Sequence, residues 1–174
     1  MRITIAGWLL LLLTLGACGS QGGSDRKQAA EALREGLAAH RDGDIEAAEE
    51  AYTQVLEALP ENKFALFNLG LIAQTRGDNA EAEELYRRAL DSDANFTPAL
   101  YNLALVRTEE GAPEEAVELY RRVVAIAPEN AAAHHNLGLL LIREGERKEG
   151  REELELALRL DPSLLESPEP ETSP

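Results

Sequence analysis

The side chains best able to do covalent, acid–base or metal chemistry are few and scattered. The chain contains one cysteine, Cys18, and three histidines. His134 and His135 are adjacent, and neighbouring side chains on a helix point about 100° apart, so they make a poor pair of metal ligands. His40 lies far from both in sequence, and no phosphate-binding glycine loop or nucleophile elbow is present. We therefore expect no metal, no cofactor and no enzymatic activity.

Cys18 ends an apolar N-terminal segment. Arg2 precedes residues 5–15, eleven residues in which only Ala6, Gly7 and Thr14 interrupt larger apolar side chains. Because eleven residues are too few to span a hydrocarbon core of about 30 Å, we interpret residues 1–17 as a signal peptide. Leu15-Gly16-Ala17-Cys18 resembles the lipobox of bacterial lipoproteins, which implies cleavage before Cys18 and acylation of its thiol, for example with palmitate. A secretory signal with a chance cysteine is the alternative.

The residues that flank the central part of the chain indicate tethers. Gly19 follows Cys18, and in the lipoprotein family a residue other than Asp there implies delivery to the outer membrane, facing the periplasm. Residues 18–28 contain the Gly/Ser-rich stretch 19–24 and are expected to form a flexible tether. Residues 165–174 are rich in Pro, Glu and Ser and are expected to be disordered.

The charge of the chain excludes one class of partner. It carries 17 basic and 32 acidic side chains, with a net charge of −15. A surface this acidic is repelled by nucleic-acid phosphates and by anionic lipid headgroups. We therefore expect no nucleic-acid partner and membrane contact only through the N-terminal lipid.

Most of the chain repeats with a period of 34 residues. Small residues, turn glycines, aromatic residues and closing prolines recur in order, for example at Gly36, Gly70, Ala104 and Gly138, or at Tyr52, Tyr86 and Tyr120. A fixed period of this length is typical of stacked helical units. The pattern resembles the tetratricopeptide repeat, which implies an all-α fold, a right-handed α-solenoid of four helix-turn-helix repeats. We place them at residues 29–62, 63–96, 97–130 and 131–164.

The second repeat illustrates how each unit is expected to fold. Apolar periodicity predicts helices over residues 64–76 and 79–91, separated by Gly77 with a positive φ and by Asp78 as an N-cap. Gly70 is expected to let the two helix backbones approach. Pro98 and Pro113 are compatible with first helical turns.

The resemblance implies a concave groove, lined by the first helices, that binds a protein or peptide. The corresponding positions fall into rows one repeat apart. The residues assigned to this groove are Phe67, Asn68, Leu71, Tyr101, Asn102, Leu105, His135 and Asn136. The three asparagines could hold a peptide backbone, because an amide both donates and accepts, or could bond the preceding repeat and set its stacking. Phe67 and Tyr101 are expected to be exposed in the groove rather than part of the core.

Two further surfaces remain open as alternatives. The second helices are rich in glutamate, as at Glu114, Glu115 and Glu118, and form either a solvated face or an acidic docking surface. The last helix carries Leu154, Leu156 and Leu158 on a flank that no fifth repeat covers. Either Leu164 and Leu165 fold back on it, or it mediates self-association or the docking of a partner.

Together these features predict a lipid-anchored, periplasm-facing adaptor that binds an envelope protein or peptide. Its lipobox and repeats resemble pilotin-type lipoproteins, which assist secretin and type IV pilus assembly. An adaptor for peptidoglycan enzymes is a second candidate.

Overall fold

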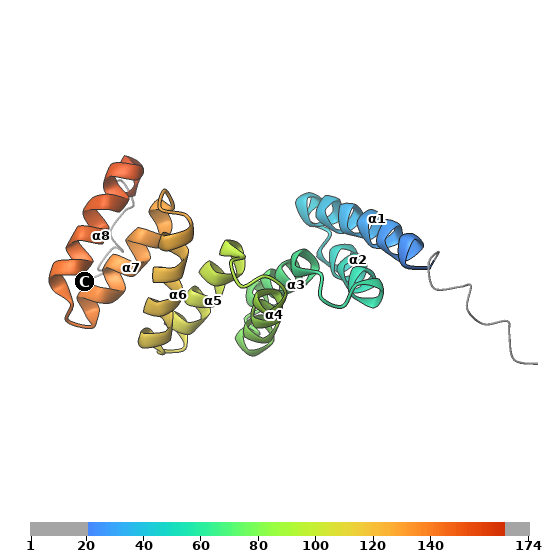
Figure 1. Ribbon diagram of the computed structural model, residues 1–174, viewed down its shortest axis with the longest axis horizontal. Coiled ribbons are helices and arrows are strands. Elements are labelled where there is room, and N and C mark those ends of the chain that lie inside the picture. Colours follow the sequence, from blue (N-terminus) through green and yellow to red (C-terminus); the bar gives the residue numbers. More distant parts are fainter. Residues whose placement is uncertain (1–20, 166–174) are drawn as a thin grey trace, which may run out of the picture.

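The computed structural model describes residues 21–165, which form eight α-helices, one short 3-10 helix and no strand. The all-α repeat fold predicted from the sequence is confirmed. Figure 1 shows the helices as a row of hairpins that runs from α1 to α8. The bounds are α1 Gln21–Asp42, α2 Ile45–Ala58, α3 Lys63–Thr75, α4 Asn79–Ser92, α5 Thr97–Glu109, α6 Pro113–Ile126, α7 Ala131–Arg143, α8 Arg147–Leu160 and η1 Pro162–Leu165.

The hairpin turns follow from glycine and from capping side chains. Gly77 between α3 and α4 has a φ of +81°, a conformation that costs glycine no steric strain. The side chain of Asp78 then accepts a hydrogen bond from the Glu81 N–H and caps α4, as predicted. Pro98 and Pro113 lie in the first turns of α5 and α6. In the second repeat, the observed helix bounds differ from the predicted ones by no more than one residue.

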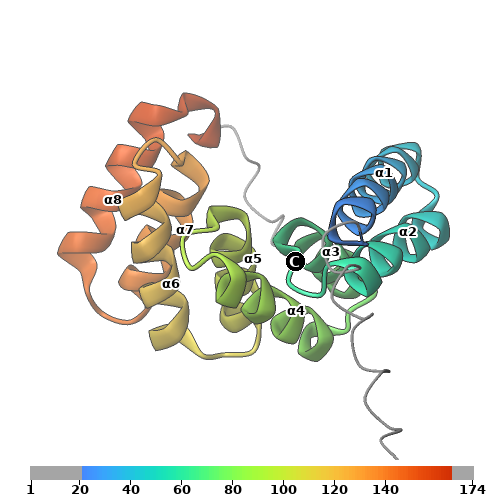
Figure 2. The same cartoon turned by 45° about the vertical axis from the view of Figure 1, so that its right-hand side comes forward.

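The core lies inside each hairpin and between neighbouring hairpins. The rings of Tyr52, Tyr86 and Tyr120 are fully buried, each on the second helix of its repeat. Between repeats, α2 packs on α3, α4 on α5 and α6 on α7. Figure 2 shows the same succession from a second side. The first helices of the second and third repeats also meet, since α3 contacts α5. Stacking thus leaves one side of α1, α3, α5 and α7 free of helical neighbours.

Three expectations from the sequence are corrected. Residues 21–28 belong to α1 rather than to a tether, because strong helix formers follow Asp25 and the buried Ala29 and Ala32 anchor the helix. Gly70 makes room for the Tyr86 ring rather than for the backbone of α4, because a Cβ atom at position 70 would lie 2.5 Å from that ring. Leu154 points into its own hairpin, toward Gly138, and is not on an outer flank.

Several predictions fall on residues 1–20 and 166–174, outside the described residues. They include the signal peptide, Cys18 and most of the C-terminal tail. Within the described part, none of the helices has the length and apolar character needed to cross a membrane.

Candidate functional site

The free sides of the first helices form one surface, which we call the first-helix face. On α3 it carries Phe64, Phe67, Asn68 and Leu71, positions that recur on one side of a helix. Three of the five large apolar side chains that are exposed among the described residues lie on this face: Leu37 at 48%, Phe64 at 47% and Leu139 at 50%. Leu71 and Leu105 of the same register are half-buried against the core. Exposed apolar side chains therefore lie on the first-helix face in the first, second and fourth repeats.

Two of the predicted asparagines bond their own helix. Asn68 Nδ2 donates to the Phe64 carbonyl at 2.7 Å, and Asn102 Nδ2 donates to the Pro98 carbonyl at 2.9 Å. A carbonyl can only accept, so the amide nitrogen must face it and Oδ1 must point away. These two side chains present acceptors on the first-helix face. They do not bond the preceding repeat.

Asn136 behaves differently from its counterparts. Its Nδ2 donates to Tyr101 Oη at 3.0 Å and to Tyr120 Oη at 3.3 Å, both in the preceding repeat. The rings of Tyr101 and Tyr120 are in edge contact at 5.8 Å. Burial raises the pKa of Tyr101, and it raises the pKa of Tyr120 to about 12, so both hydroxyls stay protonated. Asn136 and Tyr101 thus join repeats three and four, which is the stacking role considered above.

A cluster of phenylalanines crosses from the first-helix face into the core. Phe64 is in edge contact with Phe96 at 5.6 Å, and Phe96 is in edge contact with Phe67 at the same distance. Phe67 then lies 5.9 Å from Tyr86. The expectation that Phe67 and Tyr101 are exposed is only partly correct, since both are half-buried and pack against the core. Phe64, which is not among the predicted groove residues, is the exposed aromatic residue within residues 21–165.

Phe96 occupies a position where other repeats use a helix cap. Asn62 and Asn130, one repeat before and after, accept hydrogen bonds from the first N–H groups of α3 and α7. Phe96 offers α5 no such bond, and the loss of an N-cap costs about 1 kcal/mol. The aromatic contacts of Phe96 offset that loss. The contrast between Phe96 and the asparagines at the equivalent positions 62 and 130 was the sequence signal that could have identified it.

His135 lies half-buried on the first-helix face, while its neighbour His134 is buried and bonded. The exposed fraction of His134 is 4%. Its Nδ1 lies 2.5 Å from Glu153 Oε2 on α8, and its Nε2 lies 3.0 Å from the Pro128 carbonyl. In repeats two and three the positions of this pair are held by the buried residues Leu66, Leu100, Leu85 and Leu119. The pair is a structural contact that sequence reasoning missed.

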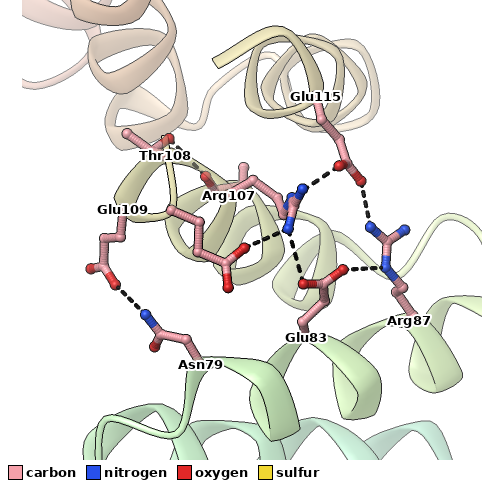
Figure 3. A network of polar contacts seen from close by, with 9 residues as sticks. Asn79, Glu83, Arg87, Arg107, Thr108, Glu109 and Glu115 are labelled. Atoms are coloured by element: carbon pink, nitrogen blue, oxygen red, sulfur yellow. Dashed lines mark hydrogen bonds and ion pairs between the residues drawn. The ribbon is translucent and has the colours of Figure 1, made fainter. Parts of the chain in front are cut away.

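Four glutamates of the second helices make ion pairs between repeats, namely Glu49, Glu83, Glu115 and Glu149. Figure 3 shows a closed ring of alternating charge that links α4, α5 and α6. Arg87 contacts Glu83 at 2.9 Å and Glu115 at 2.6 Å. Arg107 contacts Glu83 at 3.0 Å, and its Nε lies 2.9 Å from Glu115 Oε2, close enough for an ion pair but not oriented as a hydrogen bond.

This ring changes the interpretation of the acidic face. Burial raises the pKa of Glu115, but Arg87 and Arg107 lower it by more, so the carboxylate is held charged. Glu83 and Arg87 form an ion pair four residues apart on one helix. Glu115 and Glu149 instead pair with arginines of the preceding repeat, Arg87 and Arg121. These carboxylates are committed to stacking rather than left free for a ligand.

Two hollows of the described surface lie away from the first-helix face. One of about 500 Å³ follows the outer side of α2 and is lined by Glu46, Glu49, Glu50, Thr53, Gln54 and Glu57. Another of about 640 Å³ surrounds the start of α8. Both are open and lined mainly by charged side chains, so neither resembles a typical ligand pocket. Within residues 21–165, no group of three His, Cys, Asp or Glu side chains could hold a metal ion.

Comparison with known proteins identifies the family. Models of the tetratricopeptide repeat match residues 33–96 and residues 107–165, together more than two thirds of the chain. The chain belongs to the tetratricopeptide repeat family. No curated protein matches this sequence.

Solved structures of the same family resemble this tetratricopeptide repeat chain. MamA is 21% identical with a TM-score of 0.71, over 83% of this chain and 85% of that one. PilF of Pseudomonas aeruginosa is 26% identical with a TM-score of 0.70, over 80% of this chain and 64% of that one. An O-GlcNAc transferase mutant of Thermobaculum terrenum is 31% identical with a TM-score of 0.62, over 67% of this chain but only 22% of that one. These similarities show the fold and a protein-binding scaffold.

Proposed function

We propose that this chain is a lipid-anchored adaptor that faces the periplasm and binds an extended segment of an envelope protein on its first-helix face. The observation that supports binding there is the alignment of exposed apolar side chains, Leu37, Phe64 and Leu139, with outward-facing amide acceptors. Apolar side chains give a peptide area to bury, and the Oδ1 atoms of Asn68 and Asn102 accept from its backbone N–H groups. A helical ligand would have those N–H groups bonded internally, so an extended ligand fits better.

The chain acts in this proposal by binding and not by catalysis. Anchoring rests on the segment Leu15–Cys18, in which Cys18 carries the lipid. A pilotin-like role in secretin or type IV pilus assembly is the more specific candidate, supported by the similarity to PilF over 80% of this chain. The PilF chain extends well beyond the part that this chain covers, so its role is carried over only as a proposal.

Binding is tested by capture of partners from an envelope extract. Leu139→Ser changes the first-helix face, and Ile126→Ser is its matched control. Both side chains are similarly exposed, at 50% and 41%, but Ile126 ends the second helix α6 and is not on the first-helix face. Loss of one buried leucine contact should weaken binding by about tenfold. Equal capture by both variants would place the partner elsewhere. A captured secretin or pilus component favours the pilotin-like role, and a cell-wall enzyme favours the peptidoglycan adaptor.

Anchoring is tested separately by mass spectrometry of the N-terminus. The expected mature protein begins at an acylated Cys18, and Cys18→Ala should leave the membrane fraction or stay unprocessed. A mature N-terminus at another residue, without an acyl mass, would reject the lipid anchor while leaving the binding proposal intact.

A further inference from the structure

All three phenylalanines of the chain gather in one cluster, and one of them faces solvent. Phe64, Phe67 and Phe96 are in contact through their rings, and the exposed fraction of Phe64 is 47%. The Lys63 ammonium lies 5.2 Å from the centre of the Phe64 ring and 5.0 Å from that of Phe96. It also contacts Asp93 at 2.5 Å. We call Lys63, Phe64 and Phe96, backed by Phe67, the phenylalanine platform.

The architecture of the repeat does not require this platform. The positions equivalent to Phe64 hold Ala30, Pro98 and Ala132, all exposed. The position of Phe96 is a capping asparagine in the neighbouring repeats. Two departures from the repeat therefore meet at one place, and their joint effect is an aromatic surface open to solvent.

The C-terminal end of α8 lies within reach of the platform. The contacts His134–Glu153 and Gly138–Gly150 make α7 and α8 antiparallel, so the end of α8 lies beside the start of α7. From there Ala132, Pro98 and Phe64 occupy equivalent places one repeat apart. Neighbouring helices pack about 10 Å apart, so two repeats amount to roughly 20 Å.

We propose that residues 166–174 of this same chain bind on the phenylalanine platform. This segment of nine residues contains prolines at 168, 170 and 174 and glutamates at 166, 169 and 171. In an extended polyproline conformation, nine residues span about 28 Å, which exceeds the distance to be covered. Proline-rich segments bind aromatic surfaces in this conformation, because the rings pack flat and little conformational entropy is lost. At about 3.1 Å per residue, Pro174 lies far enough from Leu165 to pack on the phenylalanine platform, and Glu171, about 19 Å from Leu165, can approach the Lys63 ammonium.

This proposal requires no partner and is independent of the proposed adaptor function. A bound tail would cover Phe64 and compete with a ligand on the first-helix face. Attachment to α8 gives the tail an effective concentration in the millimolar range, so even a weak contact would be populated.

The test uses the full chain labelled with 4-fluorophenylalanine, because all three fluorine signals then report on the platform. Each signal is assigned with one Phe→Leu variant. We expect the Phe64 signal of the full chain to differ from that of a chain ending at Leu165, and to be less sensitive to exchange of H₂O for D₂O. The Phe67 signal should change little. A full-length chain with Pro168, Pro170 and Pro174 all replaced by serine is the matched control and should give the Phe64 signal of the shortened chain.

Further measurements separate the tail of the same chain from other occupants. A synthetic peptide of residues 166–174, added at millimolar concentration to the shortened chain, should move the Phe64 signal toward its full-length position. An identical Phe64 signal in the full and shortened chains would overturn the proposal. So would a tail effect that disappears on tenfold dilution, because it would then come from a second copy.

Discussion

Gly138 on α7 and Gly150 on α8 face each other so closely that neither position has room for a Cβ atom. A Cβ built on Gly138 would lie 2.7 Å from the Gly150 carbonyl oxygen, and one built on Gly150 would lie 2.6 Å from the Gly138 oxygen. In the first two repeats the equivalent glycines, Gly36 and Gly70, face a tyrosine ring instead. The fourth repeat has Leu154 in place of that tyrosine, so only this hairpin closes backbone against backbone.

This difference predicts unequal costs for alanine at the two kinds of glycine. Gly150→Ala should lower the free energy of unfolding by about 2 kcal/mol, because two backbones must separate. Gly70→Ala should cost less, since Ala104 already occupies the equivalent position opposite Tyr120 in the third repeat. In addition, the helix propensity of alanine is more favourable than that of glycine by about 1 kcal/mol. Urea denaturation of the two variants checks this. Equal destabilisation would show that the approach of α7 and α8 is not limiting.

A second prediction concerns the pair formed by the buried His134 and the half-buried Glu153. His134→Leu leaves the Glu153 carboxylate without its partner and should cost about 2 kcal/mol. Adding Glu153→Leu recreates the leucine pair of repeats two and three and should recover most of that loss, because buried polar pairs are often no more stabilising than apolar ones. A double-mutant cycle measures the coupling. If the double variant is as unstable as the sum of the single variants, the two side chains act independently.

The period of 34 residues was sufficient to predict the helices, their turns and the face that the first helices share. It was not sufficient to predict the contacts made at equivalent positions. An asparagine at 68, 102 or 136 can bond the preceding repeat only if that repeat offers a polar partner. The row one repeat back holds Leu33, Phe67 and Tyr101, and only Tyr101 has a hydroxyl. Tyr52 and Tyr86, the equivalents of Tyr120, also precede Asn68 and Asn102 by one repeat, yet these two asparagines bond their own helix. The hydroxyl of Tyr101 is therefore what distinguishes Asn136, which alone of the three joins two repeats.

The same reasoning explains what was missed. Phe96, His134 and Glu153 each break the register by placing an unusual residue at a cap or core position, and their partners become visible only when the helices are packed. Cys18 is a different case, because it lies outside the described residues and remains a prediction.

A third prediction follows from the ring of ion pairs between α4, α5 and α6. The pKa of Glu115 is lowered in the folded chain, and so is that of Glu49, chiefly by its hydrogen bond to Arg76. A lowered carboxyl pKa means that the unfolded chain binds more protons as the pH falls through its ordinary value of 4.5. The stabilisation is therefore present above that pH and is lost below it.

Arg107→Met should weaken this dependence, because Glu115 then keeps only Arg87. Urea unfolding at about pH 7 and about pH 3.5 should show that the wild type loses more stability on acidification than the variant. The difference should be about 1 kcal/mol or less, since the side chain of Glu115 is 33% exposed and solvent screens the pair. Ser92, an exposed polar residue that makes no ion pair among the described residues, provides a neutral control as Ser92→Ala. Identical losses in wild type and Arg107→Met would assign the acid sensitivity to other carboxylates.

The last prediction separates stacking from ligand binding on the first-helix face. Tyr101→Phe gives the third repeat the aromatic residue of the second and keeps the ring contact with Tyr120, but removes the 3.0 Å bond to Asn136. Because Asn136 retains Tyr120 at 3.3 Å, the cost should be about 1 kcal/mol. Asn136→Ala should cost about 2 kcal/mol, since it leaves the hydroxyls of the half-buried Tyr101 and the buried Tyr120 without this donor.

Asn102→Ala is the matched control, because Asn102 bonds only its own helix and its loss should change stability by less than about 0.5 kcal/mol. If Asn102 Oδ1 accepts from a ligand, however, the same variant should weaken ligand capture by about fivefold. In the Asn136→Ala background, Tyr101→Phe should cost nothing further, because its hydroxyl has already lost its donor. A full additional cost there would mean that the Tyr101 hydroxyl is stabilised by another group. A stable Asn102→Ala protein that captures its partner as well as the wild type does would exclude the amide row from recognition and leave the exposed leucines and Phe64 to carry it.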